Sequence, residues 1–289
     1  MNGSNPAAPP APTAPSPRHL MPAPPSRTFA GRAGHSLIAF LATARGLIAF
    51  SIITFGVFVT KFGVARDVTF PAIYHEQARS GKQVLPMFLF ISAALGLVVI
   101  GQTISLLKEI GATAYLGPIM VAVVVRELGP LLTAMLVLAR SGTRNVIELG
   151  TARALGEVEA LEALRIDPIH YLVMPRVIGM GMAVFSLTIY FIIGTLLSGY
   201  LFAFVTNVPL RPDEYVHQLT DALSGLDFVV LAIKSSLFGV VIAIITCYHG
   251  LAQPLRLEEV SRATIRAVAQ SVVACVLLDA VFIVVYLFA

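Results

Sequence analysis

Four charged side chains lie inside apolar stretches of this sequence that are long enough to cross a membrane. Arg126 and Glu127 lie midway along one stretch, Lys234 lies in a later stretch, and Asp279 lies in the last. A charge at bilayer depth is costly, so each is a candidate functional residue by default. The set holds two cations and two anions, so it can be neutral if the side chains meet.

The chemistry open to these residues is ionic. Arg126 and Glu127 are adjacent, so on a helix they point about 100° apart and pair poorly with each other. At least one of them needs a partner on another helix, in a second copy of the chain or in a ligand headgroup. Lys234 offers three donors to a phosphate. Two hypotheses remain open, namely salt bridges that pin helices together and a polar lining for an amphipathic substrate.

The composition predicts an all-α, polytopic membrane protein. Of the 289 residues, 57% are hydrophobic and 12% are charged, with a mean hydropathy of +0.84, whereas soluble domains carry about 25% charged residues. Long apolar runs recur, which favours spanning helices over the alternating strands of a membrane β-barrel. The net charge of +4 is explained by its position along the chain, so we expect no nucleic-acid partner.

Five stretches are expected to span the bilayer, and the third is long enough to tilt or to extend beyond it. The predicted spans cover residues 85–106, 113–139, 171–206, 227–248 and 267–288.

The chain before these spans has two parts. Residues 1–30 form a predicted disordered tail, because residues 1–26 hold 9 of the 18 prolines and no periodic apolar pattern. Segment 36–64 is apolar but interrupted. A single pass there would put the basic tail and the basic linker 65–84 on opposite sides, so we expect an elbow helix in the membrane interface. Residues 31–289 then form one membrane domain.

A short charged segment lies between the second and third spans. Residues 148–165 are expected to form one helix that Asp167-Pro168 ends. Because spanning segments hold it at both ends, this helix would move with them, unlike a plain solvated surface helix. Arg153 and Glu157 are four residues apart and can pair. The candidate functional residues of this helix are Glu148, Arg153, Glu157, Glu159, Glu162 and Arg165.

Lys and Arg are distributed unevenly between the two sides of the predicted membrane domain. If loop 140–176 is cytoplasmic, the opposite side keeps only Lys108 and Arg211 in its loops. The positive-inside rule therefore puts the 148–165 helix in the cytoplasm and the C-terminus outside it.

The sequence shows no catalytic or metal-binding motif. It lacks GxxxxGK[ST], HExxH and GxSxG, so the chain cannot be its own P-loop ATPase. Cys247 and Cys275 lie in apolar segments and form neither a CxxC site nor a disulfide framework. We therefore expect no enzyme activity, no metal and no cofactor in the chain itself.

Several blocks of the sequence resemble the MlaE/YrbE permeases, which are the membrane subunits of ABC transporters that work with MCE-domain proteins in lipid traffic. The blocks are RELGPLLTAMLVLARSG, from Arg126, and ELGTARALGEVEALEALRIDPIHYLVMPRV, from Glu148, with IKSSLFGVVIAIITCYHG and VSRATIRAVAQSVV later in the chain. The resemblance covers roughly residues 68–289. One departure is Gly156-Glu157, where family members often carry Glu-Gln; glycine there weakens a helix by up to about 1 kcal/mol relative to alanine.

The resemblance implies an elbow helix, five spanning helices and a homodimer over two cytoplasmic ABC ATPase subunits, which bind the ATP. It implies that 148–165 is the coupling helix that docks on the ATPase. It also implies that Arg126, Glu127 and Lys234 face lipid between the protomers, with Asp279 as a further lipid-binding candidate. The other implied partners are a periplasmic MCE-domain lipid-binding protein, membrane phospholipid and, as a candidate, a small STAS-type accessory subunit. The implied location is the bacterial inner membrane.

The predicted function is therefore a permease subunit that moves phospholipid or a similar lipid and is driven by a separate ATPase. The alternative is a secondary carrier for a hydrophobic substrate, driven by protons through Glu127 and Asp279. Transport that depends on a proton gradient without any ATPase would favour this alternative. The lack of a nucleophile or metal cluster disfavours a lipid-modifying enzyme.

We predict that the Pro-rich tail and the C-terminus lie on opposite sides of the membrane, with the tail in the cytoplasm. The reason is the uneven distribution of Lys and Arg. Single cysteines placed at each end, in a chain without Cys247 and Cys275, should differ in their reaction with a membrane-impermeant thiol reagent. Labelling of both ends from one side would contradict the five-span topology.

Overall fold

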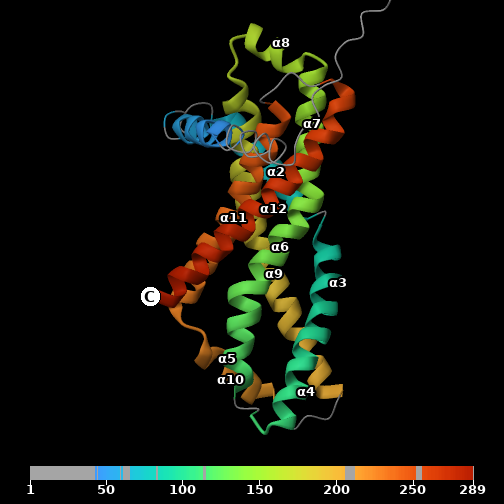
Figure 1. The fold of residues 1–289 in the computed structure, drawn as a ribbon, viewed down its shortest axis with the longest axis vertical. Helices are drawn as coiled ribbons and strands as arrows, with labels where there is room; N and C mark the ends of the chain where they lie inside the picture. Colours follow the sequence, from blue (N-terminus) through green and yellow to red (C-terminus); the bar gives the residue numbers. More distant parts are fainter. Residues whose placement is uncertain are drawn as a thin grey trace, which may run out of the picture. The chain divides into compact units, whose positions relative to one another are not determined.

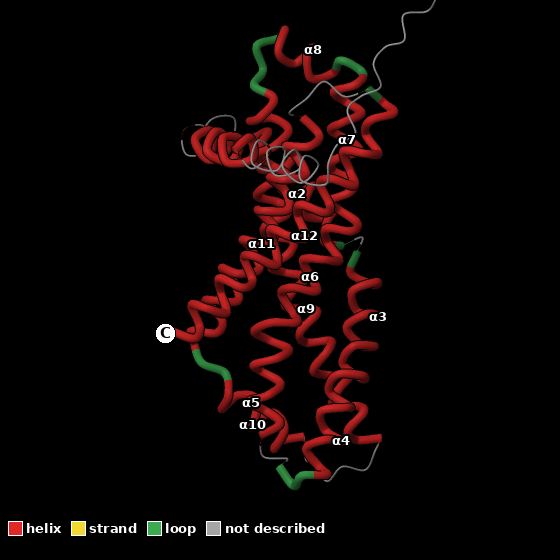
Figure 2. The backbone as a smooth tube through the Cα atoms, viewed as in Figure 1, coloured by secondary structure: helices red, strands yellow, loops and turns green. Residues whose placement is uncertain are grey.

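The computed structural model describes residues 43, 45–58, 60, 66–82, 84–112, 115–205, 212–251 and 256–288. All regular elements among these residues are helical, and the described chain contains no strand, as the sequence predicts (Figure 2). The chain divides into a unit of residues 1–45 and a unit of residues 46–289. The predicted tail 1–30 lies outside the described residues.

Five helical stretches of the described chain are long and apolar enough to cross a membrane, with mean hydropathies between 1.9 and 2.5 over their most apolar windows. They are Leu85–Glu109, Leu116–Ala154, Ile169–Phe204, Gly225–Leu251 and Leu257–Tyr286. The prediction of five spans is confirmed. The second helix continues well beyond residue 139 and the last begins well before residue 267, because charged residues can stay helical once they leave the apolar layer.

Short π-helical turns interrupt the first two spans without ending them, and another begins the third. The first span consists of α3 (Leu85–Leu95), η1 (Gly96–Ile100) and α4 (Gly101–Glu109). The second consists of α5 (Leu116–Met120), η3 (Val121–Leu128), α6 (Gly129–Val137), η4 (Leu138–Gly142) and α7 (Thr143–Ala154). The third consists of η5 (Ile169–Val173) and α9 (Met174–Val205), the fourth is α11 (Gly225–Leu251) and the fifth is α12 (Leu257–Phe288). Connecting helices are α2 (Arg66–Gly81), α8 (Glu157–Ala163) and α10 (Pro212–Ala222).

Helix α9 is the centre of the packing, because it contacts α2, α3, α6 and α11. Helices α11 and α12 contact each other along their lengths, and α12 also contacts α7. Figure 1 shows α8 at one end of the long helices and α4, α5 and α10 at the other. These ends are called the α8 end and the α10 end below.

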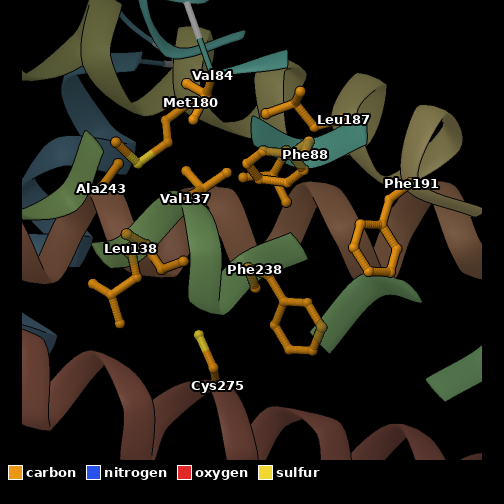
Figure 3. Close-up of a cluster of buried hydrophobic side chains, with 13 residues drawn as sticks. Val84, Phe88, Val137, Leu138, Met180, Leu187, Phe191, Phe238, Ala243 and Cys275 are labelled. Carbon is orange, nitrogen blue, oxygen red and sulfur yellow. The ribbon is translucent and has the colours of Figure 1, made fainter. Parts of the chain in front are cut away.

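The main hydrophobic core joins all five spans (Figure 3). The rings of Phe88 from α3 and Phe191 from α9 meet edge to face with centroids 6.4 Å apart. The same core contains three fully buried side chains from the other spans, namely Val137 from α6, Phe238 from α11 and Cys275 from α12. Both cysteines of the chain are free and buried, and each belongs to a hydrophobic cluster.

The apolar segment before α2 contains the helix Arg45–Phe58. A helix of this length extends about 20 Å, which is less than the apolar thickness of a bilayer. It lies across the direction of the long helices, in dark blue in Figure 1, and the ring of Phe50 meets that of Tyr248 on α11 edge to face at 5.8 Å. Residues 36–42 and 61–64 lie outside the described residues, so the elbow over 36–64 stays a prediction.

The prediction of one continuous helix over residues 148–165 is wrong. Helix α7 ends at Ala154, and Gly156 takes a left-handed conformation with φ of 78°. Its N–H donates to the carbonyl of Arg153 at 3.2 Å, so glycine ends one helix and α8 begins directly after it. The predicted pair of Arg153 with Glu157 is also replaced: Arg153 Nε lies 3.1 Å from Glu159 Oε1.

Close packing of α9 on α11 depends on two glycines. A Cβ added at Gly239 would lie 2.6 Å from the carbonyl oxygen of Met180 and 2.7 Å from the Cα of Gly181. Small residues let membrane helices approach closely in this way.

We predict that Gly239→Ala destabilises the protein by about 1–3 kcal/mol, because the two backbones must move apart. Thermal unfolding in detergent, with size-exclusion chromatography, measures the effect. Gly225→Ala is the matched control on the same helix, since a Cβ there meets nothing within 4 Å. Equal stability of the two variants would show that the α9–α11 distance is not fixed by Gly239.

Candidate functional site

A cluster of charged side chains lies toward the α10 end, where η3 meets α11 and α12. Arg126 lies about 15 Å along its span from Leu116, at 1.5 Å per residue. The π-helical turn Val121–Leu128 carries both Arg126 and Glu127, and such turns are frequent at functional sites. We call the set of Arg126, Glu127, Asp227, Lys234, Asp279 and Tyr286 the outer cluster.

Lys234 is the centre of the outer cluster, and its side chain is only 1% exposed. Its Nζ lies 2.9 Å from Glu127 Oε2 and 2.8 Å from Asp279 Oδ1. It also donates to the carbonyl oxygen of Arg126 at 2.9 Å. The ammonium group thus donates two hydrogen bonds, to Glu127 and to the Arg126 carbonyl, and forms an ion pair with Asp279.

The carbonyl of Arg126 can accept a hydrogen bond from Lys234 because of a residue four positions later in the same helix. In an α-helix this carbonyl would accept from the N–H four residues later, and residue 130 is proline, which has none. The sequence therefore creates an open main-chain acceptor inside the membrane, and Lys234 fills it. Pro130 is itself fully enclosed at the start of α6.

Arg126 points to a different helix and pairs with Asp227. Its Nε lies 2.9 Å from Asp227 Oδ1 and its Nη2 donates to Oδ2 at 3.1 Å. The Tyr286 hydroxyl donates to Asp227 Oδ1 at 3.1 Å, and the Tyr286 ring lies 5.2 Å from the guanidinium carbon. Asp227 also accepts from the backbone N–H of Ser224 at 2.9 Å, so it closes the start of α11 as well.

Asp227 and Tyr286 are members of the outer cluster that the sequence did not single out. Asp227 falls at the first position of a predicted span, where it resembles an ordinary boundary residue. A signal was present, because Ser224 and Asp227 have the spacing of a capping box and so mark the helix start. That signal predicts the cap but not the pairing with Arg126, which depends on how the helices pack.

The structure thus brings together all four membrane charges that the sequence singles out. Adjacency predicts a partner elsewhere for at least one of Arg126 and Glu127, and each pairs with a residue of another helix, so the ion pairs between helices are present. The side chains of Arg126 and Glu127 are 33% and 32% exposed, whereas that of Asp227 is 2% exposed. The η3 side of the outer cluster is therefore open to a ligand, and contact with lipid stays a prediction.

A second charged cluster lies toward the α8 end and joins α2, α7 and α9. It consists of Glu76, Arg79, Arg144, Glu148 and Arg176 and is called the inner cluster. Arg79 Nη1 donates to Glu148 Oε1 at 2.9 Å and its Nη2 to Glu76 Oε2 at 2.7 Å. Burial opposes the charge of Arg79, but Glu76 and Glu148 outweigh burial and raise the pKa of its guanidinium above the ordinary value.

The predicted coupling residues do not all lie on one surface. Glu148 belongs to the inner cluster, where Arg176 Nη2 also donates to it at 3.3 Å. Arg153 pairs with Glu159 and, at 3.9 Å, with Glu162, and those two carboxylates are about half exposed. Glu157 begins α8 and Arg165 follows its end. Val158, a residue that the sequence analysis missed, fixes α8 to the helix ends through a fully buried apolar contact with a group that includes Leu149 and Leu251.

Comparison with known proteins assigns this arrangement to a family. The family description Permease MlaE matches residues 73–285, which include the inner cluster and every member of the outer cluster except Tyr286. The chain belongs to the MlaE permease family. The resemblance noted from its motifs is confirmed.

The MlaE chain is also similar to several named proteins. A probable ABC transporter permease protein of Synechocystis sp. is 33% identical over 199 residues, which are 67% of this chain and 73% of the relative. A probable ABC transporter permease protein of Rickettsia felis is 31% identical over 65% of this chain and 72% of its own length. Protein TRIGALACTOSYLDIACYLGLYCEROL 1, chloroplastic, of Arabidopsis thaliana is 30% identical over 70% of this chain and 57% of its own length. The chain is thus a multi-pass ABC transporter permease.

We predict that Lys234→Met destabilises the protein by about 3–5 kcal/mol, because Glu127 and Asp279 lose their shared cation inside the membrane. The triple variant Lys234→Met, Glu127→Gln, Asp279→Asn should recover most of this loss, since it leaves no unpaired charge. The measurement is thermal unfolding of each purified variant beside its co-purified phospholipid per folded protein. A Lys234→Met variant with full stability and less lipid would contradict a structural role for these ion pairs.

Proposed function

We propose that this MlaE permease moves phospholipid or a similar lipid between a bacterial inner membrane and a periplasmic MCE-domain partner. A separate cytoplasmic ABC ATPase drives the movement, so the chain itself carries out no covalent chemistry. The family supports the transporter class, and the name of the Arabidopsis relative contains that of a diacylglycerol lipid.

The observation that carries the proposal is the open side of the outer cluster. Arg126 presents a guanidinium at bilayer depth that is one third exposed, and such groups bind phosphate through two parallel hydrogen bonds. Asp227 and Tyr286 hold the guanidinium in place without covering it. A lipid phosphate can therefore approach Arg126 while its acyl chains stay in the apolar layer.

The same helix connects this site to the α8 end. Arg126 and the inner-cluster residue Glu148 both belong to the helix Leu116–Ala154, which is about 58 Å long at 1.5 Å per residue. A shift of this helix at the α8 end therefore changes the position of Arg126 relative to α11 and α12. We infer that α8, held by Val158 with its carboxylates outward, contacts the ATPase and passes on the closure that ATP binding causes.

The proposal includes a homodimer, in which two copies of the outer cluster face one lipid pathway. Large apolar side chains remain exposed along α12, Val276, Leu277 and Val284 among them. A second protomer or lipid chains would cover such a surface. A periplasmic MCE protein would then take lipid at the α10 end, and a STAS-type subunit is a candidate on the cytoplasmic side.

One observation favours the proton-driven carrier as the second candidate. Lys234 lies between two carboxylates, those of Glu127 and Asp279. The outer cluster holds three carboxylates against two cations, so one carboxylate can carry a proton. Lipid movement that follows a proton gradient without ATP would support this candidate.

The coupling role of α8 is tested by reversing its outward charges. We predict that Glu159→Lys with Glu162→Lys lowers the amount of co-purified ATPase about tenfold, because a reversed charge at an interface meets like charge on the partner. The complex is purified from native membranes in mild detergent, and ATP hydrolysis and lipid transfer between vesicles are then measured.

Glu258→Lys is the matched control, because Glu258 is an exposed carboxylate on α12 at the same end of the helices. It should leave assembly, ATP hydrolysis and lipid transfer unchanged. Full assembly and transfer in the double α8 variant would exclude α8 as the coupling element. ATP-independent transfer by the unaltered complex would exclude the ABC mechanism.

A further inference from the structure

A cavity of about 450 Å³ lies beside the inner cluster, between α2 and the start of the third span. One wall comes from α2, where His75 and Arg79 lie one turn apart. The other wall includes His170, Leu172 and Arg176. The volume lies within the range of small-molecule sites.

The walls of this cavity carry more positive charge than the inner cluster neutralises. Three guanidinium groups, those of Arg79, Arg144 and Arg176, share the two carboxylates of Glu76 and Glu148. The Nε–H group of each arginine is buried and finds no acceptor among the described residues. Buried donors without acceptors are uncommon in native proteins. Counted over its described members, the inner cluster therefore holds one more cation than anions.

The lining of the cavity has a charged part and an apolar part, as the interface of a membrane does. Arg176 lies about 10 Å along the third span from its first residue, at 1.5 Å per residue, so the charged wall is near the end of the apolar layer. Leu172 and Pro175 form an apolar part of the lining, and the Tyr171 ring, half exposed, lies at its edge. An amphipathic ligand with a phosphate at one end fits these walls better than a fully polar one.

The cavity is built into the packing of α2 on α9. Gly179 lets the two helices approach, since a Cβ there would lie 2.9 Å from the Glu76 Cβ. Glu76 is 5% exposed and holds Arg79 at the cavity wall. The position of the arginines is thus set by the fold rather than by flexible surface side chains.

We propose that this cavity binds a phosphate-bearing anion, either the headgroup of an anionic phospholipid in the leaflet at the α8 end or a free phosphate compound. The phosphate supplies the missing anion to Arg79 and Arg176, and an acyl chain follows the apolar wall. Because Glu148 on α7 pairs with the same arginines, an occupied site ties α2 and α9 more firmly to the helix that carries Arg126. This site is separate from the outer cluster, and its occupancy does not require transport.

The test uses the purified full-length chain in detergent, titrated with phosphatidylglycerol, phosphatidylcholine or inorganic phosphate. Bound lipid is counted by native mass spectrometry, and thermal unfolding is followed by circular dichroism. The unaltered chain should bind and be stabilised by phosphatidylglycerol in preference to phosphatidylcholine. Stabilisation by inorganic phosphate alone, at matched ionic strength, would identify a free phosphate compound as the source. Equal responses to all three probes would overturn the proposal.

The decisive variant is Ala72→Glu, which puts a tethered carboxylate on the cavity wall. It should keep or raise the stability of the ligand-free protein, because the new carboxylate supplies the missing anion. It should weaken phosphatidylglycerol binding about tenfold, since like charge opposes the phosphate. Gln77→Glu is the matched control, because it adds the same charge to α2 on the side that faces away from this cavity, toward Tyr190.

A second variant, Arg176→Gln, removes one phosphate donor and should also weaken binding. Unchanged phosphatidylglycerol preference in both Ala72→Glu and Arg176→Gln would overturn the proposal, as would an equal loss in Gln77→Glu. These readouts need neither ATP hydrolysis nor lipid transfer. The site can therefore fail while the proposed transport function stands, and the reverse also holds.

Discussion

A buried ammonium group needs opposite charge and hydrogen-bond acceptors around it, and Lys234 finds them on two neighbouring helices. Glu127 comes from the second span, Asp279 comes from the fifth, and Lys234 itself comes from the fourth. Removing Lys234 leaves two carboxylates without their shared cation in an apolar layer, which is among the more costly changes a protein can suffer. The packing of α11 and α12 against η3 is therefore tied to an electrostatic condition as well as to apolar contact.

The two charged clusters are mechanically related because one helix carries a member of each. Arg126 lies on η3 and Glu148 lies on α7, and no break separates them. In both clusters, ion pairs as well as apolar contacts join the helix Leu116–Ala154 to the neighbouring helices. At the two clusters this helix therefore meets its neighbours through charged side chains, whereas the central core around Phe88 and Phe238 is closely packed.

The sequence predicts this protein well where a local pattern decides the outcome. Apolar length specifies the five spans, and the cost of membrane charge identifies Arg126, Glu127, Lys234 and Asp279. The pairing of Arg126 with Asp227 could not be predicted, because it depends on the packing of α11 on η3. Gly156 was noted in the sequence only as a weakening of one helix; the structure shows that its left-handed conformation ends the helix, so Glu148 and Glu159 lie on different elements. The position of a glycine in the sequence alone cannot show whether it ends a helix or lies within one.

The bond from Lys234 to the carbonyl of Arg126 has a consequence for how this position can change. A side-chain acceptor is lost when its residue is replaced, but a main-chain carbonyl is present whatever residue occupies the position. As long as proline stays at position 130, Lys234 keeps this acceptor when residue 126 is replaced. Replacement of Arg126 therefore takes the cation from Asp227 but leaves this acceptor of Lys234 in place. The two cations of the outer cluster can therefore change independently at this point, and their independence depends on a proline.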